Sequence, residues 1–119
     1  MRTRFSLLAA VVFLGGCSPS SPKGFESPDP QERARAGLKA VARGERARAV
    51  DLVDLLKSDD SAARLAAIGG LRQLTGKDFG YDYAAQARER NAAIERWVEW
   101  LESIEGHRFV GASVNDSRP

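Results

Sequence analysis

The chain has 119 residues, which is enough for one domain and little more. Lys and Arg number 18, Asp and Glu number 16, and the isoelectric point is near 9.0. Basic and acidic residues alternate along the chain instead of gathering on one basic face, so the sequence does not indicate a nucleic-acid partner. A single cysteine, Cys17, excludes an intramolecular disulfide and a zinc site built from several cysteines.

The N-terminus has the three parts of a secretory signal peptide. Two arginines lie within the first four residues, an apolar run covers residues 5–14, and a pair of glycines precedes Cys17. The apolar run is about ten residues long, whereas a membrane-spanning helix needs roughly 20. We therefore expect an export signal and not a transmembrane anchor. The two arginines account for the basic excess, so the rest of the chain is formally neutral.

The tetrapeptide Leu14-Gly15-Gly16-Cys17 resembles the lipobox of bacterial lipoproteins. The resemblance implies that residues 1–16 are a cleaved signal peptide and that Cys17 carries the lipid, including palmitate, that anchors the chain to a membrane of the cell envelope. Ser18 then favours the outer membrane in a host with two membranes. The alternative is an ordinary signal peptide with an incidental cysteine.

Composition divides the remainder of the chain into three parts. Serine and proline dominate residues 17–28, which predicts the lipidated cysteine followed by a flexible linker. Helical periodicity predicts an all-α domain of about four helices over residues 29–105. We expect residues 106–119 to form a mostly disordered tail because they are largely polar.

The first helix has strong start and stop signals. Asp29 is expected to cap it, Pro30 suits the first helical position, and Glu32 completes a capping-box pattern. The helix should run to about Arg43, where Gly44 can supply a left-handed turn.

Second and third helices are predicted from about Glu45 to Lys57 and from about Asp60 to Leu74. Within the third helix, Gly69-Gly70 lowers helix propensity but permits close approach of a neighbouring helix. An aromatic loop over residues 77–84 precedes a fourth helix, which starts near Ala85 or Asn91 and ends before Gly106. Core candidates at helical spacing are Ala34, Leu38, Val41, Ala42, Ala49, Val50, Leu52, Val53, Leu55, Leu56, Leu65, Ala66, Ile68, Leu71, Leu74, Ile94, Trp97, Val98 and Leu101.

An offset of 31 residues superimposes two segments of the sequence. Asp29 falls on Asp60, Arg33 on Arg64 and Ala36 on Ala67, so the pattern Asp-x-x-x-Arg-x-x-Ala occurs twice. Residues 50–71, a leucine-rich segment followed by an Asp turn and an Arg- and Ala-rich segment, resemble HEAT repeats. The resemblance implies an array of two helix pairs in which the arginine bonds a neighbouring turn. A helical bundle without repeats is the alternative.

Candidate sites are few. The aromatic loop and the last helix offer Tyr81, Tyr83 and Trp100 as partner contacts, since Tyr and Trp are frequent at interfaces. The competing interpretation is that Phe79, Tyr81 and Trp97 pack as a hydrophobic cap. The acidic pairs Asp59-Asp60 and Asp78/Asp82 are better explained by helix capping and turns than by cation binding or acid–base chemistry.

These observations predict a membrane-anchored lipoprotein with a non-enzymatic helical domain that binds or scaffolds protein. We expect no catalytic, cofactor or metal site, no small-molecule substrate and no nucleic acid. The partner is expected to be another envelope protein or a second copy of the chain, because arrays of only two repeats rarely stand alone. The alternative is an accessory or regulatory subunit of an envelope enzyme or secretion complex.

Overall fold

A computed structural model describes the backbone of residues 21–114 and the side chains of residues 21–106. The described part is all-α, as predicted, with no strand. The expected signal peptide and Cys17 lie outside these residues. The elements are the short 3₁₀ helices η1 (Gly24–Glu26) and η2 (Arg46–Arg48) and the α-helices α1 (Pro30–Ala42), α2 (Ala49–Leu55), α3 (Ser61–Thr75) and α4 (Ala87–Val114).

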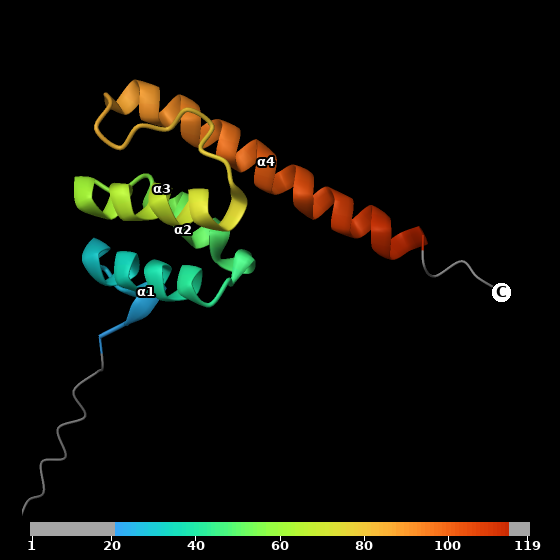
Figure 1. Cartoon of the computed structure of the whole chain (residues 1–119), viewed down its shortest axis with the longest axis horizontal. Helices are drawn as coiled ribbons and strands as arrows, with labels where there is room; N and C mark the ends of the chain where they lie inside the picture. Colours follow the sequence, from blue (N-terminus) through green and yellow to red (C-terminus); the bar gives the residue numbers. More distant parts are fainter. Residues whose placement is uncertain (1–20, 115–119) are drawn as a thin grey trace, which may run out of the picture.

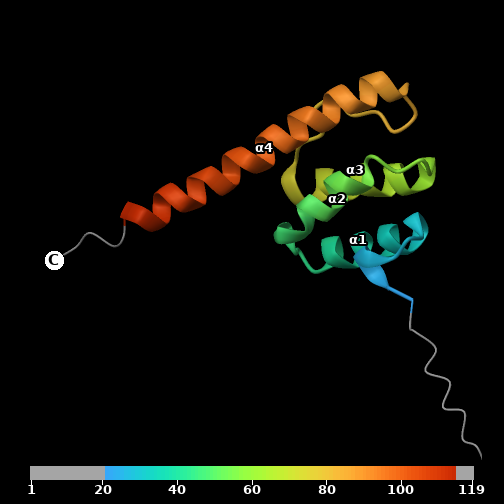
Figure 2. The ribbon, with the colours of Figure 1, turned by 180° about the vertical axis from the view of Figure 1, so that it is seen from behind.

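The helices form a stack in which alternate segments run in the same direction. In Figure 1, α1, α3 and α4 all run from left to right, and α2 returns between α1 and α3. The return from α3 to α4 is made by a loop, residues 76–86, and not by a helix. Seen from behind in Figure 2, α1 and α4 again lie on opposite sides of α3. None of the helices that the structure describes is long and apolar enough to cross a membrane.

The starts of α1 and α3 are built alike. Asp29 and Asp60 are the N-caps, with nearly equal backbone angles, and each side chain accepts a hydrogen bond from an N–H of the first turn. The cap's own N–H donates to the serine two residues earlier, Ser27 or Ser58. This serine replaces the capping box that we expected of Glu32. The 31-residue repeat therefore includes a shared Ser-x-Asp cap.

Helices α1 and α3 pack closely because glycine lies between them. An added Cβ at Gly70 would be 2.9 Å from Val41 Cγ2 and 3.3 Å from Leu52 Cδ1, whereas one at Gly69 would meet nothing within 4 Å. At the helix starts, Gln31 Nε2 of α1 donates to the carboxylate of Asp60. Of the predicted Gly69-Gly70 pair, only Gly70 lies at a close approach to its neighbours.

The predicted helix ends are confirmed at two glycines and wrong at the third. Gly44 and Gly76 have φ of 67° and 73° and end α1 and α3 in the left-handed conformation. Gly106 is not among the described glycines with positive φ, and α4 continues through it to Val114. A glycine that keeps helical angles costs a helix only about 1 kcal/mol, so it does not by itself stop one. The expected tail from residue 106 therefore begins as helix.

Two other boundaries differ from the prediction. The expected linker of residues 17–28 is folded in its second half: η1 packs on α1, Phe25 is half-buried, and the guanidinium of Arg48 lies 5.2 Å from its ring centre. An aromatic ring can cover a helix even in a Ser/Pro-rich segment. The expected helix 45–57 is shorter, because η2 precedes α2 and Glu45 provides no side-chain cap.

The core lies between α1, α2, α3 and the first half of α4. Its largest fully buried side chains are Trp97, Tyr81, Leu52, Leu56, Ile68 and Leu71. Four predicted core residues are instead between 37% and 55% exposed: Leu38, Val50, Leu65 and Val98. Ala42 is exposed as well. Helical spacing identifies an apolar stripe but not which of its edges meets a neighbour.

The two adjacent glycines of α3 should respond oppositely to alanine. We expect Gly69→Ala to stabilise the chain by about 0.5–1 kcal/mol because it removes unfolded-state freedom at an open helical position. We expect Gly70→Ala to destabilise it by about 1–3 kcal/mol because the methyl group overlaps Val41. Urea unfolding followed by circular dichroism measures both, and effects of the same sign would contradict this packing.

The bond between Gln31 and Asp60 makes a pH-dependent contribution. The Gln31 amide, together with backbone N–H groups of α3, holds the pKa of the Asp60 carboxyl below its ordinary value of 3.8. A lowered folded-state pKa stabilises the fold above the unfolded value, and this contribution is lost as the pH falls through the folded one. Gln31→Ala should therefore raise the Asp60 pKa in an NMR titration and destabilise the chain more at pH 7 than near pH 2. Equal destabilisation at both pH values would contradict the bond.

Candidate functional site

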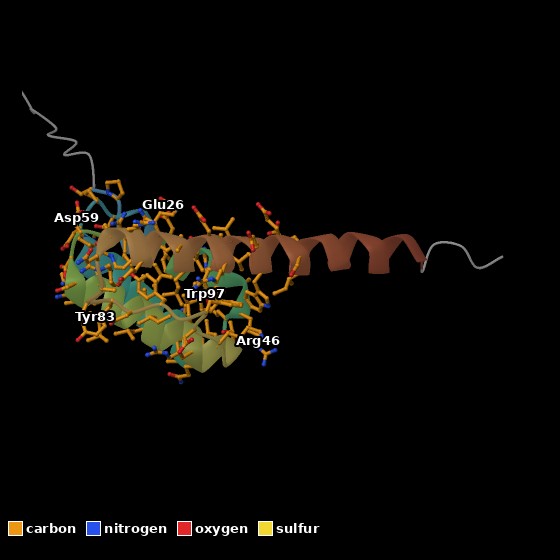
Figure 3. All side chains as sticks on the ribbon, turned by 90° about the horizontal axis from the view of Figure 1, so that it is seen from above. Glu26, Arg46, Asp59, Tyr83 and Trp97 are labelled. Carbon is orange, nitrogen blue, oxygen red and sulfur yellow. The ribbon has the colours of Figure 1, made fainter. Side chains whose placement is uncertain are left out.

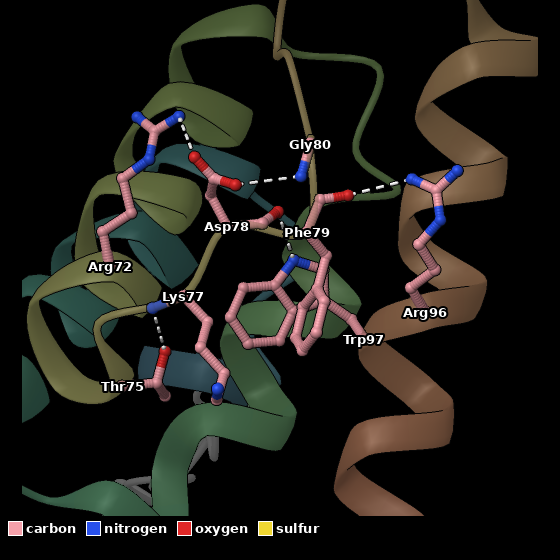
Figure 4. Close-up of polar contacts among 8 residues, drawn as sticks. All are labelled: Arg72, Thr75, Lys77, Asp78, Phe79, Gly80, Arg96 and Trp97. Atoms are coloured by element: carbon pink, nitrogen blue, oxygen red, sulfur yellow. Dashed lines mark hydrogen bonds and ion pairs between the residues drawn. The ribbon is translucent and has the colours of Figure 1, made fainter.

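The loop between α3 and α4 contains a tight turn clasped to α4. Phe79 and Gly80 have φ of 52° and 74°, Gly80 N–H donates to Asp78 Oδ1, and Tyr81 N–H donates to the Asp78 carbonyl. From α4, Trp97 Nε1 donates to the Asp78 carbonyl at 3.2 Å and Arg96 to the Phe79 carbonyl at 2.9 Å (Figure 4). These two donors fix α4 against the turn.

Three aromatic rings extend this clasp along α4. A left-handed conformation costs a residue other than glycine roughly 1–2 kcal/mol. Phe79 offsets that cost by packing edge-to-face on Trp97, with ring centres 4.7 Å apart. Trp100 lies 5.7 Å from Trp97 and 6.1 Å from Phe79 and is half-buried. The turn thereby determines where Trp100 lies on the surface.

Tyr81 belongs to the core. It is 2% exposed, and its hydroxyl donates to the Leu56 carbonyl at 2.7 Å, which ties the loop to the end of α2. Burial raises the pKa of this hydroxyl, because the phenolate would lose hydration. This geometry matches the hydrophobic-cap interpretation and removes Tyr81 from the residues that a partner can reach.

Arg64 connects the two turns that flank α3. Its guanidinium donates to the carbonyls of Ser58 and Asp59 before the helix and to the carbonyl of Tyr83 after it. Arg64 is 7% exposed. From the sequence we expected this arginine to bond one neighbouring turn, whereas in the structure it bonds two. The repeat is not symmetrical here, because Nε of the equivalent Arg33 is buried without a hydrogen-bond partner among the described residues.

Beyond Trp100 the surface forms a groove of about 320 Å³, and seven of its ten lining residues are apolar. It lies where α4 crosses the starts of η2 and α2 and the end of α3. Its polar lining is limited to Arg46, Thr75 and Glu105, and the Thr75 hydroxyl is already bonded to the Leu71 carbonyl. The remaining lining residues are Ala47, Ala49, Val50, Leu74, Trp100, Leu101 and Ile104.

The three predicted contact residues do not share one surface. Trp100 lines the groove, and Tyr81 is buried. Tyr83 is 36% exposed but lies at the opposite end of the domain from Arg46 (Figure 3). Sequence reasoning missed Val50, which it placed in the core. On ideal helical geometry Val50 lies about 160° around the helix from Leu52, so the two side chains face nearly opposite sides of the helix. This angle could have identified Val50 as exposed.

The acidic residues act as turn and cap groups. Asp60 caps α3, and Asp78 and Asp82 each accept the N–H two residues later. Within the described side chains, no three His, Cys, Asp or Glu residues are grouped as a metal site. Comparison with known proteins found no family model, curated protein or solved structure that matches this chain.

The Tyr81 hydroxyl provides a test of the cap. Tyr81→Phe should destabilise the chain by about 1–2 kcal/mol at pH 7, because the Leu56 carbonyl is left without its donor. With a raised folded-state pKa, Tyr81 stabilises the fold below pH 10 and loses that contribution as the pH rises further, so the deficit of the variant should shrink. Tyr83→Phe is the matched control and should be neutral at pH 7. Chemical unfolding at pH 7 and above pH 10 decides, and equal responses of the two variants would refute the cap.

Proposed function

We propose that this chain is a lipid-anchored bacterial envelope lipoprotein whose HEAT-like helical domain binds or scaffolds protein without catalysing a reaction. The groove beside Trp100 is the observation that carries the binding role. It is concave, seven of its ten lining residues are apolar, and it contains Val50, which is 55% exposed. A concave site lined by apolar side chains with a few polar groups can receive a segment of a partner protein.

Three features support a HEAT-like description of the domain. Helices α1 and α3 run in the same direction with α2 returning between them. Both begin with a Ser-x-Asp cap, and both carry an arginine four residues after the aspartate. Gly70 of α3 allows close packing on Val41 of α1. The departure is the second return segment, which is a loop.

The lining of the groove favours binding over catalysis. General acid–base or nucleophilic chemistry needs converging polar groups. Here the only polar side chains are Arg46, Glu105 and an internally bonded Thr75. Apolar walls of alanine, valine, leucine and tryptophan instead suit the apolar stripe of another helix.

Photocrosslinking in the host tests the binding role. A benzophenone amino acid at position 50 should give a specific protein adduct in intact cells, because this position faces the groove. The same residue at position 65, which is also an exposed apolar helix position outside the groove lining, should give none. Adducts at both positions or at neither would remove the groove as a binding site.

The same cells test the anchor. Metabolic labelling with palmitate should mark the unmodified chain and not Cys17→Ser. Labelling of both would contradict lipidation at Cys17, whereas an adduct at position 50 tests the groove independently of the lipid.

A further inference from the structure

Two parts of α4 have no neighbouring element packed over them in the described structure: the side that lines the groove and the C-terminal end of the helix. The helix contributes Trp100, Leu101, Ile104 and Glu105 to the groove and then continues to Val114. In Figures 1 and 2 this last part of α4 leaves the domain, and no other described element lies beside it. The open groove and the projecting end are consecutive on the same helix, so one contact can cover both.

The sequence of the projecting part is that of a contact segment. From Glu95 to Glu105, α4 carries four glutamates, which suit a solvated face. Residues 106–114, Gly-His-Arg-Phe-Val-Gly-Ala-Ser-Val, contain no acidic residue and include a phenylalanine and two valines. A helix end without tertiary contacts is marginal in water, because most helical stability in proteins comes from packing. A packing partner would therefore stabilise residues 106–114 as helix.

We propose that the groove is occupied by residues 106–114 of α4 from a second copy of this chain. The inference rests on the proposed function, because it names the partner of the same groove. The two α4 helices lie antiparallel around a two-fold axis near Glu105, so that each copy inserts its projecting end into the groove of the other. Such an interface uses the same surface twice and closes as a dimer.

Charge is consistent with this arrangement. Neither Arg46, on the η2 wall of the groove, nor Glu105, on the α4 wall, takes part in any ion pair among the described side chains. A two-fold axis near Glu105 brings the two Glu105 carboxylates toward each other, and the Arg46 side chains of both copies are the cations that offset their repulsion. Antiparallel α4 helices also align their dipoles favourably.

Cysteine crosslinking of the full chain in its own membrane tests the dimer. Cys17 is the only cysteine, so the unmodified chain measures the background. Glu105→Cys lies near the proposed axis and should give a disulfide-linked dimer on oxidation. Glu95→Cys is the control: ten residues back along the helix is about 15 Å, which separates the two copies of this position by about 30 Å. It should react with maleimide but give no dimer.

Substitutions in the groove provide a second test of the dimer. In the Glu105→Cys background, Val50→Glu should lower the dimer yield at least about tenfold, because it places a charge in the apolar wall. Leu65→Glu, which also replaces an exposed apolar residue, should leave the yield unchanged. Resistance of each variant to limited proteolysis verifies its folding.

The outcomes separate the two proposals. Absence of a dimer from Glu105→Cys, or a dimer that is insensitive to Val50→Glu, overturns this inference. If position 50 then crosslinks to a different protein, the proposed function stands and the second copy is wrong as the partner. An adduct within one chain, to residues before Ser21, also overturns it. A chain-to-chain adduct at position 50, with the dimer described above, confirms it.

Discussion

The guanidinium of Arg64 holds together the two connections on which the fold depends. The turn before α3 presents the carbonyls of Ser58 and Asp59, and the loop after α3 presents the carbonyl of Tyr83. A buried guanidinium is costly unless its donors are paired, and here three carbonyls accept hydrogen bonds from Nε and Nη1. Because the acceptors come from both sides of α3, the loop cannot leave the domain without exposing or orphaning this charge.

Once the loop is held, the position of α4 follows. The turn at Asp78 and Phe79 presents two carbonyls to Trp97 and Arg96, and the Phe79 ring packs on Trp97. Polar and apolar contacts thus act on consecutive residues of one helix. Trp100, three residues after Trp97, is placed at the surface by the same cluster. The groove is therefore a consequence of how the loop closes the core.

The sequence predicted best what local groups decide. The limits of α1 and α3 were predicted within about a residue, because Asp29, Asp60, Gly44 and Gly76 act on their own turns. Predictions from the sequence were wrong where contacts between distant segments determine the structure. Phe25 became part of the domain because α1 offers it a surface, and the exposure of Val50 depends on the path of α4. Of the candidate contacts, only Trp100 lies in the groove.

The loop that takes the place of a second returning helix completes the core and also leaves part of the surface uncovered. In the first layer a helix, α2, returns from α1 and fills the space beside α3. In the second layer the loop 76–86 returns, and its Tyr81 and Phe79 pack in and against the core. Helix α4 then crosses the starts of η2 and α2, where its Trp100, Leu101 and Ile104 line the groove. Because a loop and not a helix fills this place, the groove beside Trp100 stays open.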